Sequence, residues 1–133
     1  MKKLFVLVIF FSLWSCGQPG AADDSSVLAP QAFAEKLKSN ADIVLLDVRS
    51  SEEMLSGYLK GAQHLDFNSP GFRSSLDSLD HSRTYLVYCA SGKRSGKALD
   101  MMKGIGFQKV RVLEGGLNAW ITAGFPVQQP FTF

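Results

Sequence analysis

Two continuous apolar runs constrain the fold of this chain more than any other feature of its sequence. The first, DIVLLDV, covers residues 42–48, and the second, TYLVYC, covers residues 84–89. Apolar runs of this length are typical of strands buried on both faces, which belong to parallel sheets covered by helices on both sides. The two runs therefore predict an α/β domain in which both strands are buried within the sheet.

Segments with other patterns alternate with these runs. Three more strands are predicted at residues 27–28 (VL), 61–67 (GAQHLDF) and 109–113 (KVRVL). Helices are predicted where apolar residues follow helical spacing between starting and ending signals. Their ranges are 29–40, 50–59, 71–79, 93–104 and 117–127. This alternation favours a mostly parallel five-stranded sheet with helices on both faces.

The beginning of the chain carries a pattern for export. Two lysines precede an apolar run over residues 4–11, and small residues follow at positions 15–17. This layout is typical of an export signal, and the run is too short to cross a bilayer comfortably as a helix. LWSC at residues 13–16 resembles the bacterial lipoprotein cleavage box, in which the cysteine is lipidated after cleavage. We therefore expect a lipoprotein-type signal peptide over residues 1–15 and a lipid on Cys16.

Cys16 has two other interpretations, a spectator in a discarded signal peptide or a disulfide partner for Cys89. Lipidation would exclude the disulfide, because it consumes the thiol. Residues 16–26 are small and polar, with glycine and proline, and are typical of a flexible tether to a domain over residues 27–130. This arrangement predicts an exported protein of the cell envelope, in the periplasm or at the outer membrane, held to a membrane through Cys16.

The net charge of the chain bears on which kinds of partner the protein can bind. The chain has 14 Lys and Arg residues and 12 Asp and Glu residues, so loss of the two signal-peptide lysines would leave 12 of each. A near-neutral domain carries no basic footprint for nucleic acid. The two histidines and two cysteines are too scattered in the sequence for a zinc site, so we expect no metal.

The segment CASGKRS, residues 89–95, joins the second apolar run to a predicted helix. Gly92 permits a tight turn, in which successive amides can surround the Cys89 sulfur and the helix can direct its positive end towards it. Lys93 and Arg94 add positive charge, and all these effects favour the thiolate. The same residues also fit a plainer interpretation, a small buried hydrophobic residue followed by a solvated helix face. Cations at the start of a helix are unfavourable, because they lie at the positive end of the helix dipole. Their presence there suggests that an anion is bound nearby, which favours a reactive Cys89 over the plainer interpretation.

Three motifs in order resemble the rhodanese-like sulfurtransferase family. CASGKRS is similar to the family's active-site loop, LLDVRSSEEMLSGYLKGA (residues 45–62) to its first signature, and VLEGGLNAWITAGFPV (residues 112–127) to its closing one. The resemblance implies a three-layer α/β domain with Cys89 as the nucleophile. The substrate-binding residues of the loop would then be Ala90, Ser91, Gly92, Lys93, Arg94 and Ser95.

Details of the motifs refine this expectation. Tyr58 and Lys60 stand where the family usually has histidine and proline, and Ala90 stands where some members that act on thiosulfate have arginine. Four residues separate Cys89 from Arg94, whereas five separate the same pair in related cysteine phosphatases. The loop therefore has the sulfurtransferase length by resemblance, and phosphatase or arsenate chemistry is the last of the alternatives.

The expected activity is transfer of sulfane sulfur by double displacement. The Cys89 thiolate takes sulfur from a thiosulfate- or persulfide-type donor, becomes a persulfide, and passes the sulfur to a thiol or to cyanide. The expected partners are a small anionic donor, one of these acceptors and, as a further option, a protein that accepts sulfur. This scheme needs no cofactor. The alternatives are a carrier or binding module that holds a persulfide without turning over, and a redox pair of Cys16 with Cys89.

Asp47 and Arg49 end the first apolar run, at the same edge of a parallel sheet as Cys89. We expect Asp47 to accept hydrogen bonds from nearby loop amides. Arg49 is expected to pair with Glu52 or Glu53. Both residues are predicted to support the site structurally and to take no part in the reaction.

Overall fold

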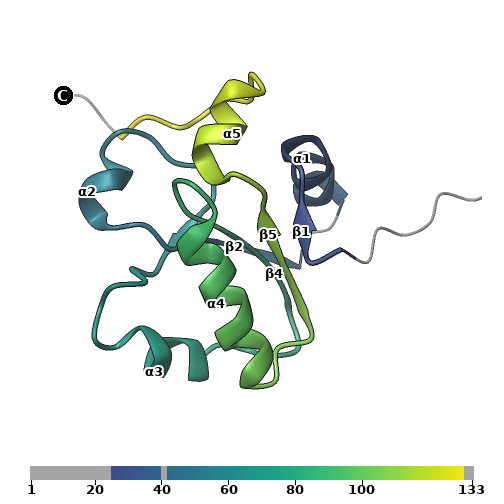
Figure 1. Ribbon diagram of the computed structural model, residues 1–133, viewed down its shortest axis with the longest axis vertical. Helices are drawn as coiled ribbons and strands as arrows, with labels where there is room; N and C mark the ends of the chain where they lie inside the picture. The colour runs from purple at the N-terminus through teal and green to yellow at the C-terminus, as the bar shows by residue number, and fades with distance from the viewer. Residues whose placement is uncertain (1–24, 40–41, 131–133) are drawn as a thin grey trace, which may run out of the picture.

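A five-stranded parallel sheet forms the centre of the computed structural model, which describes residues 25–39 and 42–130 (Figure 1). The strands follow the order β1–β5–β4–β2–β3, and each neighbouring pair is parallel. Their bounds are β1 (Val27–Leu28), β2 (Ile43–Asp47), β3 (Gln63–His64), β4 (Thr84–Tyr88) and β5 (Lys109–Leu113). The helices are α1 (Pro30–Ser39), α2 (Ser51–Met54), α3 (Phe72–Asp77), α4 (Lys93–Gly104) and α5 (Gly116–Thr122). The predicted α/β fold is confirmed.

The two long apolar runs form β2 and β4, which lie side by side. In their register Leu45 faces Leu86, and Leu46 faces Val87. Successive side chains of a strand point to opposite faces of the sheet, so each run contributes to two cores. The core on the α3 and α4 face includes Val44, Leu46, Val87, Phe72, Leu76, Ala98 and Met102. The core on the α1 and α5 face includes Leu45, Leu86, Phe33, Leu117 and Trp120. In Figure 1, α4 lies to the left of β4 and β5, and α1 lies to their right.

The helix α2 is shorter than the helix predicted over residues 50–59. It begins with a capping box, in which the Ser50 hydroxyl accepts from the Glu53 amide and the Glu53 carboxylate accepts from the Ser50 amide. After about one turn the chain leaves the helix, and Gly57 adopts a φ of +123°. The Arg49 guanidinium donates to the carbonyl oxygens of Glu53 and Gly57, which gives these groups partners without a longer helix.

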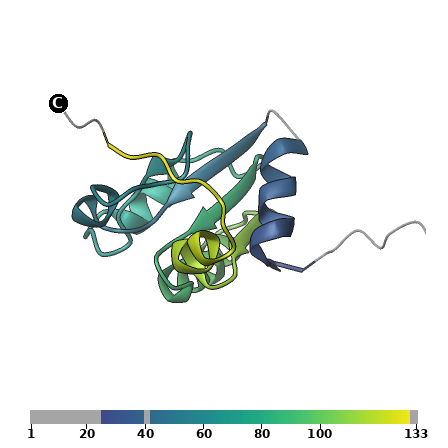
Figure 2. The ribbon, with the colours of Figure 1, turned by 90° about the horizontal axis from the view of Figure 1, so that it is seen from above.

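The end of the chain returns across the molecule after α5. The helix predicted over residues 117–127 ends at Thr122, and Gly124 just beyond it has a φ of +85°, which lets the chain turn back. The following segment reaches the residues after α2, where Tyr58 and Gln128 form an antiparallel bridge (Figures 1 and 2). The bridge connects the last segment to the loop that carries α2.

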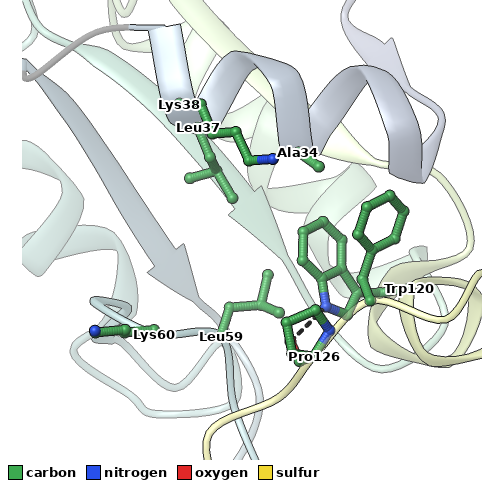
Figure 3. Close-up of a pocket in the computed structure, with 8 residues that line it drawn as sticks. Ala34, Leu37, Lys38, Leu59, Lys60, Trp120 and Pro126 are labelled. Carbon is green, nitrogen blue, oxygen red and sulfur yellow. Dashed lines mark hydrogen bonds between the residues drawn. The ribbon is translucent and has the colours of Figure 1, made fainter.

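A cavity of about 400 Å³ lies between α1 and the segment after α5 (Figure 3). Its lining residues are Ala34, Leu37, Lys38, Leu59, Lys60, Trp120, Phe125 and Pro126. Trp120 stacks on Phe125 with the ring centroids 4.5 Å apart, and the indole N–H donates to the Pro126 carbonyl. The Lys60 ammonium group points away from Trp120 in Figure 3. No lining residue belongs to the segment 89–95, so the cavity is separate from the site described below.

Candidate functional site

Cys89 follows the last residue of β4, and the chain turns around its sulfur before α4 begins at Lys93. Gly92 allows the turn because its φ of +95° lies in the left-handed region that other residues rarely adopt. The amide nitrogens of Gly92 and Ser95 lie 3.1 and 3.4 Å from Sγ, and the Ser95 hydroxyl oxygen also lies 3.4 Å from it. Cys89 is fully buried. Two amide donors therefore point at the sulfur, and the Ser95 hydroxyl, which also lies 3.2 Å from the Gly92 carbonyl oxygen, can donate to the sulfur when it is ionised.

These donors decide the ionisation of the thiol. Burial raises the pKa of Cys89, because the thiolate loses contact with water. Hydrogen bonds from the Ser95 hydroxyl and from the amides of Ser95, Gly92 and Ser91 lower the pKa and together outweigh burial. The pKa of Cys89 therefore lies below its ordinary value. A thiolate at this position is the form that acts as a nucleophile.

The start of α5 holds the other side of the loop. Gly116 has a φ of +61°, and a Cβ atom on it would lie 2.5 Å from the Cys89 carbonyl oxygen. This close approach allows the Leu117 amide to donate to the Cys89 carbonyl at 2.8 Å and the Asn118 amide to donate to the Ala90 carbonyl at 3.0 Å. Two successive carbonyl groups of the loop therefore point towards α5.

Arg94 is bound by an acidic residue from another part of the chain. Its two terminal nitrogens donate to the two carboxylate oxygens of Glu53 at 2.7 and 2.8 Å. The Arg94 guanidinium lowers the pKa of Glu53 to about 2, and the Ser50 hydrogen bonds act in the same direction. Lys93, the neighbouring cation, is exposed. The predicted pairing of Arg49 with Glu52 or Glu53 is therefore wrong, because Glu53 binds Arg94 and the ion pair of Arg49 is with Asp47.

Asp47 and Arg49 form a buried ion pair. The Arg49 Nη2 atom lies 2.6 Å from Asp47 Oδ2, and Nε lies 3.0 Å from Oδ1. The Arg49 amide also donates to Asp47 Oδ1 at 3.0 Å, which agrees with the prediction that Asp47 accepts from a loop amide. Since Arg49 also donates to the carbonyls of Glu53 and Gly57, the pair fixes the segment that carries α2. This geometry is that of a support for the site.

Two residues near this pair were not singled out from the sequence as parts of the site. The Tyr88 hydroxyl accepts from the Leu59 amide at 3.0 Å, and burial raises the Tyr88 pKa. The His64 Nε2 atom lies 2.7 Å from the Arg49 carbonyl oxygen, so this nitrogen carries the ring proton. Both contacts join segments that are far apart in the sequence. The position of Tyr88 directly before Cys89 could have indicated from the sequence that it lies near the site. No neighbouring residue indicates that its hydroxyl binds the Leu59 amide.

The predicted signal peptide, Cys16 and all but the last two residues of the predicted tether lie outside the described residues. The division into residues 1–15, 16–26 and 27–130 therefore stays a prediction. None of the helices in the part of the chain that the structure describes has both the length and the apolar character needed to cross a membrane. Among residues 25–39 and 42–130, no three His, Cys, Asp or Glu side chains are grouped so that they could hold a metal ion.

Comparison with known protein families and proteins gives a consistent result. The family described as the rhodanese-like domain matches residues 29–123. A sulfurtransferase of Allochromatium vinosum is 29% identical over 100 residues, which cover 75% of this chain and 92% of the relative. A thiosulfate sulfurtransferase of Ectopseudomonas mendocina is 32% identical over 99 residues, which cover 74% of this chain and 86% of the relative.

A solved structure shares the arrangement of helices and strands. The crystal structure of a rhodanese-related protein from Thermoplasma volcanium superposes with a TM-score of 0.69 at 26% sequence identity. The match covers 78% of this chain and 98% of that one. The likeness therefore extends over nearly the whole of that protein.

Proposed function

The chain belongs to the rhodanese-like domain family, and from this premise we propose that it is a sulfurtransferase that works through a persulfide on Cys89. The observation that carries the proposal is the set of donors around Sγ, with two amide nitrogens and one hydroxyl within 3.4 Å. Such donors stabilise a thiolate before sulfur transfer, and they remain in place to stabilise the negative charge of a persulfide after it. Its sulfurtransferase relatives support sulfur transfer in general.

The first half-reaction loads the cysteine. The Cys89 thiolate attacks the sulfane sulfur of the donor, a new S–S bond forms to Cys89, and the S–S bond within the donor breaks. The bonding electron pair leaves with sulfite when the donor is thiosulfate, and with a thiolate when the donor is a hydropersulfide. Charge and electrons balance in both cases, so this step needs no external oxidant or reductant.

The second half-reaction removes the transferred sulfur from Cys89. An acceptor thiolate or cyanide attacks the outer sulfur of the persulfide, and the electron pair of the broken S–S bond returns to Cys89 as the thiolate. The product is a new persulfide or thiocyanate. Neither half-reaction requires a metal or an organic cofactor, because the main-chain amides stabilise the charge on sulfur throughout.

The residues of the loop have distinct roles in this scheme. Cys89 is the nucleophile, and Ser95, Gly92 and Ser91 provide the donors that favour its anion. Lys93 is exposed beside them and supplies positive charge for an anionic donor. Ala90 contributes through its backbone, since its carbonyl accepts from α5. Arg94 is bound by the Glu53 carboxylate.

The mass of the intact protein after exposure to a donor tests this proposal. Thiosulfate or glutathione hydropersulfide should add one sulfur atom to the protein, and fragmentation should locate it on Cys89. A Cys89→Ser variant should gain no mass, while subsequent addition of cyanide should return the wild-type protein to its original mass. An equal gain of sulfur in the serine variant would contradict the mechanism.

A carrier is the second candidate, and the burial of Cys89 favours it. A sulfur with no exposed surface can hold a persulfide that small acceptors reach slowly, so that a partner protein becomes the physiological acceptor. Steady-state thiocyanate formation from thiosulfate and cyanide separates the two functions. Sustained turnover supports the enzyme, whereas a persulfide on Cys89 that persists in cyanide supports the carrier.

We further propose that the protein is exported and held in the cell envelope by a lipid on Cys16, with residues 16–26 as its tether. The support is the sequence pattern of the first residues alone. Metabolic labelling with a fatty acid should mark the wild-type protein and leave a Cys16→Ser variant unlabelled. Recovery of the wild-type protein in the cytoplasmic fraction would contradict export.

A further inference from the structure

We propose that Glu53 sets the donor preference of this site by binding Arg94, so that the loop accepts a hydropersulfide more readily than a dianion such as thiosulfate. The inference rests on the proposed function, sulfur transfer through Cys89. It adds the class of donor and the residue that selects it. Glu53 is a specificity-determining residue in this view, and it does not touch the reacting sulfur.

The Glu53–Arg94 pair is held firmly. Both terminal nitrogens of Arg94 bind Glu53, which is the geometry that makes such pairs strong and directional. Glu53 is held in turn, because its Oε2 atom accepts from the Ser50 amide at 2.9 Å within the capping box. Rotating Arg94 towards a donor would therefore break two charge-assisted hydrogen bonds.

Negative groups of the chain compensate Arg94 without a donor. Lys93 and Arg94 contribute two positive charges at the start of α4. Glu53 neutralises Arg94, and the negative charges of the Cys89 thiolate and of Asp66 also act on Arg94. Arg94 is therefore bound by a carboxylate of the chain itself, whereas neither Lys93 nor Asp66 forms an ion pair within the described residues. Of the two cations at the start of α4, only Lys93 is therefore left without a counter-charge for an incoming anion within the described residues.

The two donor classes place different demands on such a loop. Attack of the Cys89 thiolate on thiosulfate brings one negative charge towards a dianion whose sulfonate group is bonded directly to the sulfane sulfur. Attack on a hydropersulfide of formula R–S–SH forms the Cys89 persulfide and releases R–S⁻, so that a single negative charge is redistributed. Repulsion between like charges is therefore much larger for thiosulfate. A site that binds one of its two cations internally suits the hydropersulfide.

The substitution Glu53→Gln tests the inference. Glutamine keeps an oxygen that can accept from the Ser50 amide, so the cap of α2 is retained while the charge that binds Arg94 is removed. We expect the KM for thiosulfate to fall about tenfold, because a freed guanidinium attracts the dianion in the ground state. The ratio of kcat/KM for thiosulfate to kcat/KM for cysteine hydropersulfide should rise by a similar factor.

Three matched variants attribute the change to Arg94. Glu52→Gln removes the same charge from an exposed position on the same helix and should leave the ratio within about twofold of wild type, because long-range charge is screened. Glu53→Asp keeps a carboxylate near Arg94 and should retain the wild-type preference. When Arg94→Gln is added to Glu53→Gln, the rise in the donor ratio that Glu53→Gln alone produces should be abolished, as a double-variant cycle would measure.

The outcomes separate this inference from the proposed function. An unchanged donor ratio in Glu53→Gln, with Cys89 still forming a persulfide, would overturn the inference alone. The same gain in Glu52→Gln or Glu53→Asp would also overturn it, since general charge or loosening of α2 would then be the cause. Failure of the wild-type protein to form any persulfide on Cys89 would overturn both.

Discussion

Gly116 approaches Cys89 so closely that a Cβ atom at this glycine would lie 2.5 Å from the Cys89 carbonyl oxygen. The approach lets the amides of Leu117 and Asn118 bind the carbonyls of Cys89 and Ala90. In a trans peptide the N–H points away from the carbonyl, so these bonds also direct the next loop amides away from α5. The start of α5 thus helps to direct the Ser91 amide, which shares a peptide with the Ala90 carbonyl and is one of the amides that lower the pKa of Cys89.

Gly116→Ala is expected to destabilise the protein and the loop together. The added Cβ meets the backbone of Cys89 and Ala90, and alanine is also strained at a positive φ, so the free energy of unfolding should fall by about 2–4 kcal/mol. Gly124→Ala is the matched control, because that glycine also has a positive φ but an added Cβ meets no atom within 4 Å. It should cost about 1 kcal/mol. Equal losses in urea denaturation would show that the contact with the loop is unimportant.

Ser95→Ala should raise the pKa of Cys89. The hydroxyl is the largest of the hydrogen-bonding influences that lower this pKa, and burial remains when it is removed. Because the thiolate is the reactive form, the rate of alkylation by iodoacetamide should reach its midpoint at a higher pH than in wild type. Ser95→Thr retains a hydroxyl and should stay near the wild-type midpoint. A profile for Ser95→Ala that does not move would contradict this account of the thiolate.

The Glu53–Arg94 pair should make stability depend on pH in acid. The pKa of Glu53 falls from 4.5 to about 2 in the folded state, so its contribution is complete above pH 4.5 and is lost as the pH falls towards 2. Both side chains are partly exposed, so solvent screening reduces the contribution to about 1 kcal/mol. The difference in unfolding free energy between wild type and Glu53→Gln should therefore close between pH 4.5 and pH 2. A difference that persists at pH 2 would exclude the ion pair as its cause.

Asp47→Asn should cost about 3–5 kcal/mol of stability, because it leaves the buried Arg49 guanidinium without its counter-charge. The double variant Asp47→Leu with Arg49→Met removes both charges and should be more stable than Asp47→Asn alone. Denaturation in urea measures both. Where the protein remains folded, Cys89 should still form a persulfide, since neither residue touches the sulfur. Loss of the persulfide in a folded Asp47→Asn protein would assign Asp47 to the reaction.

Much of this site could be predicted from local sequence. The continuous apolar runs place β2 and β4 within the sheet, because strands buried on both faces have no polar alternation. CASGKRS places Cys89 at the end of a strand, and Gly92 indicates the turn that the chain makes around it. The prediction that donors would surround the sulfur follows from these neighbours alone. The three motifs also indicate the family, because they occur in one chain in the family's order and at compatible spacing.

The partners of the charged residues could not be predicted in the same way. Arg49 and Arg94 both had Glu53 within their possible reach, and the sequence spacing favoured Arg49. In the folded chain Arg49 is buried against Asp47, and Glu53 binds Arg94, which lies 41 residues away. From the sequence alone, several different ion pairs between these arginines and the acidic residues are equally possible.

The sequence by itself determined the strands, the turn at Gly92 and the cysteine that the turn encloses, because each depends on the properties of adjacent residues. Only the tertiary structure decided that α5 would hold the loop through Gly116 and that Glu53 would bind Arg94. Both contacts depend on where separate helices meet at the carboxyl edge of the sheet. That position is set by the packing of two cores over β2 and β4, which acts between residues far apart in the chain.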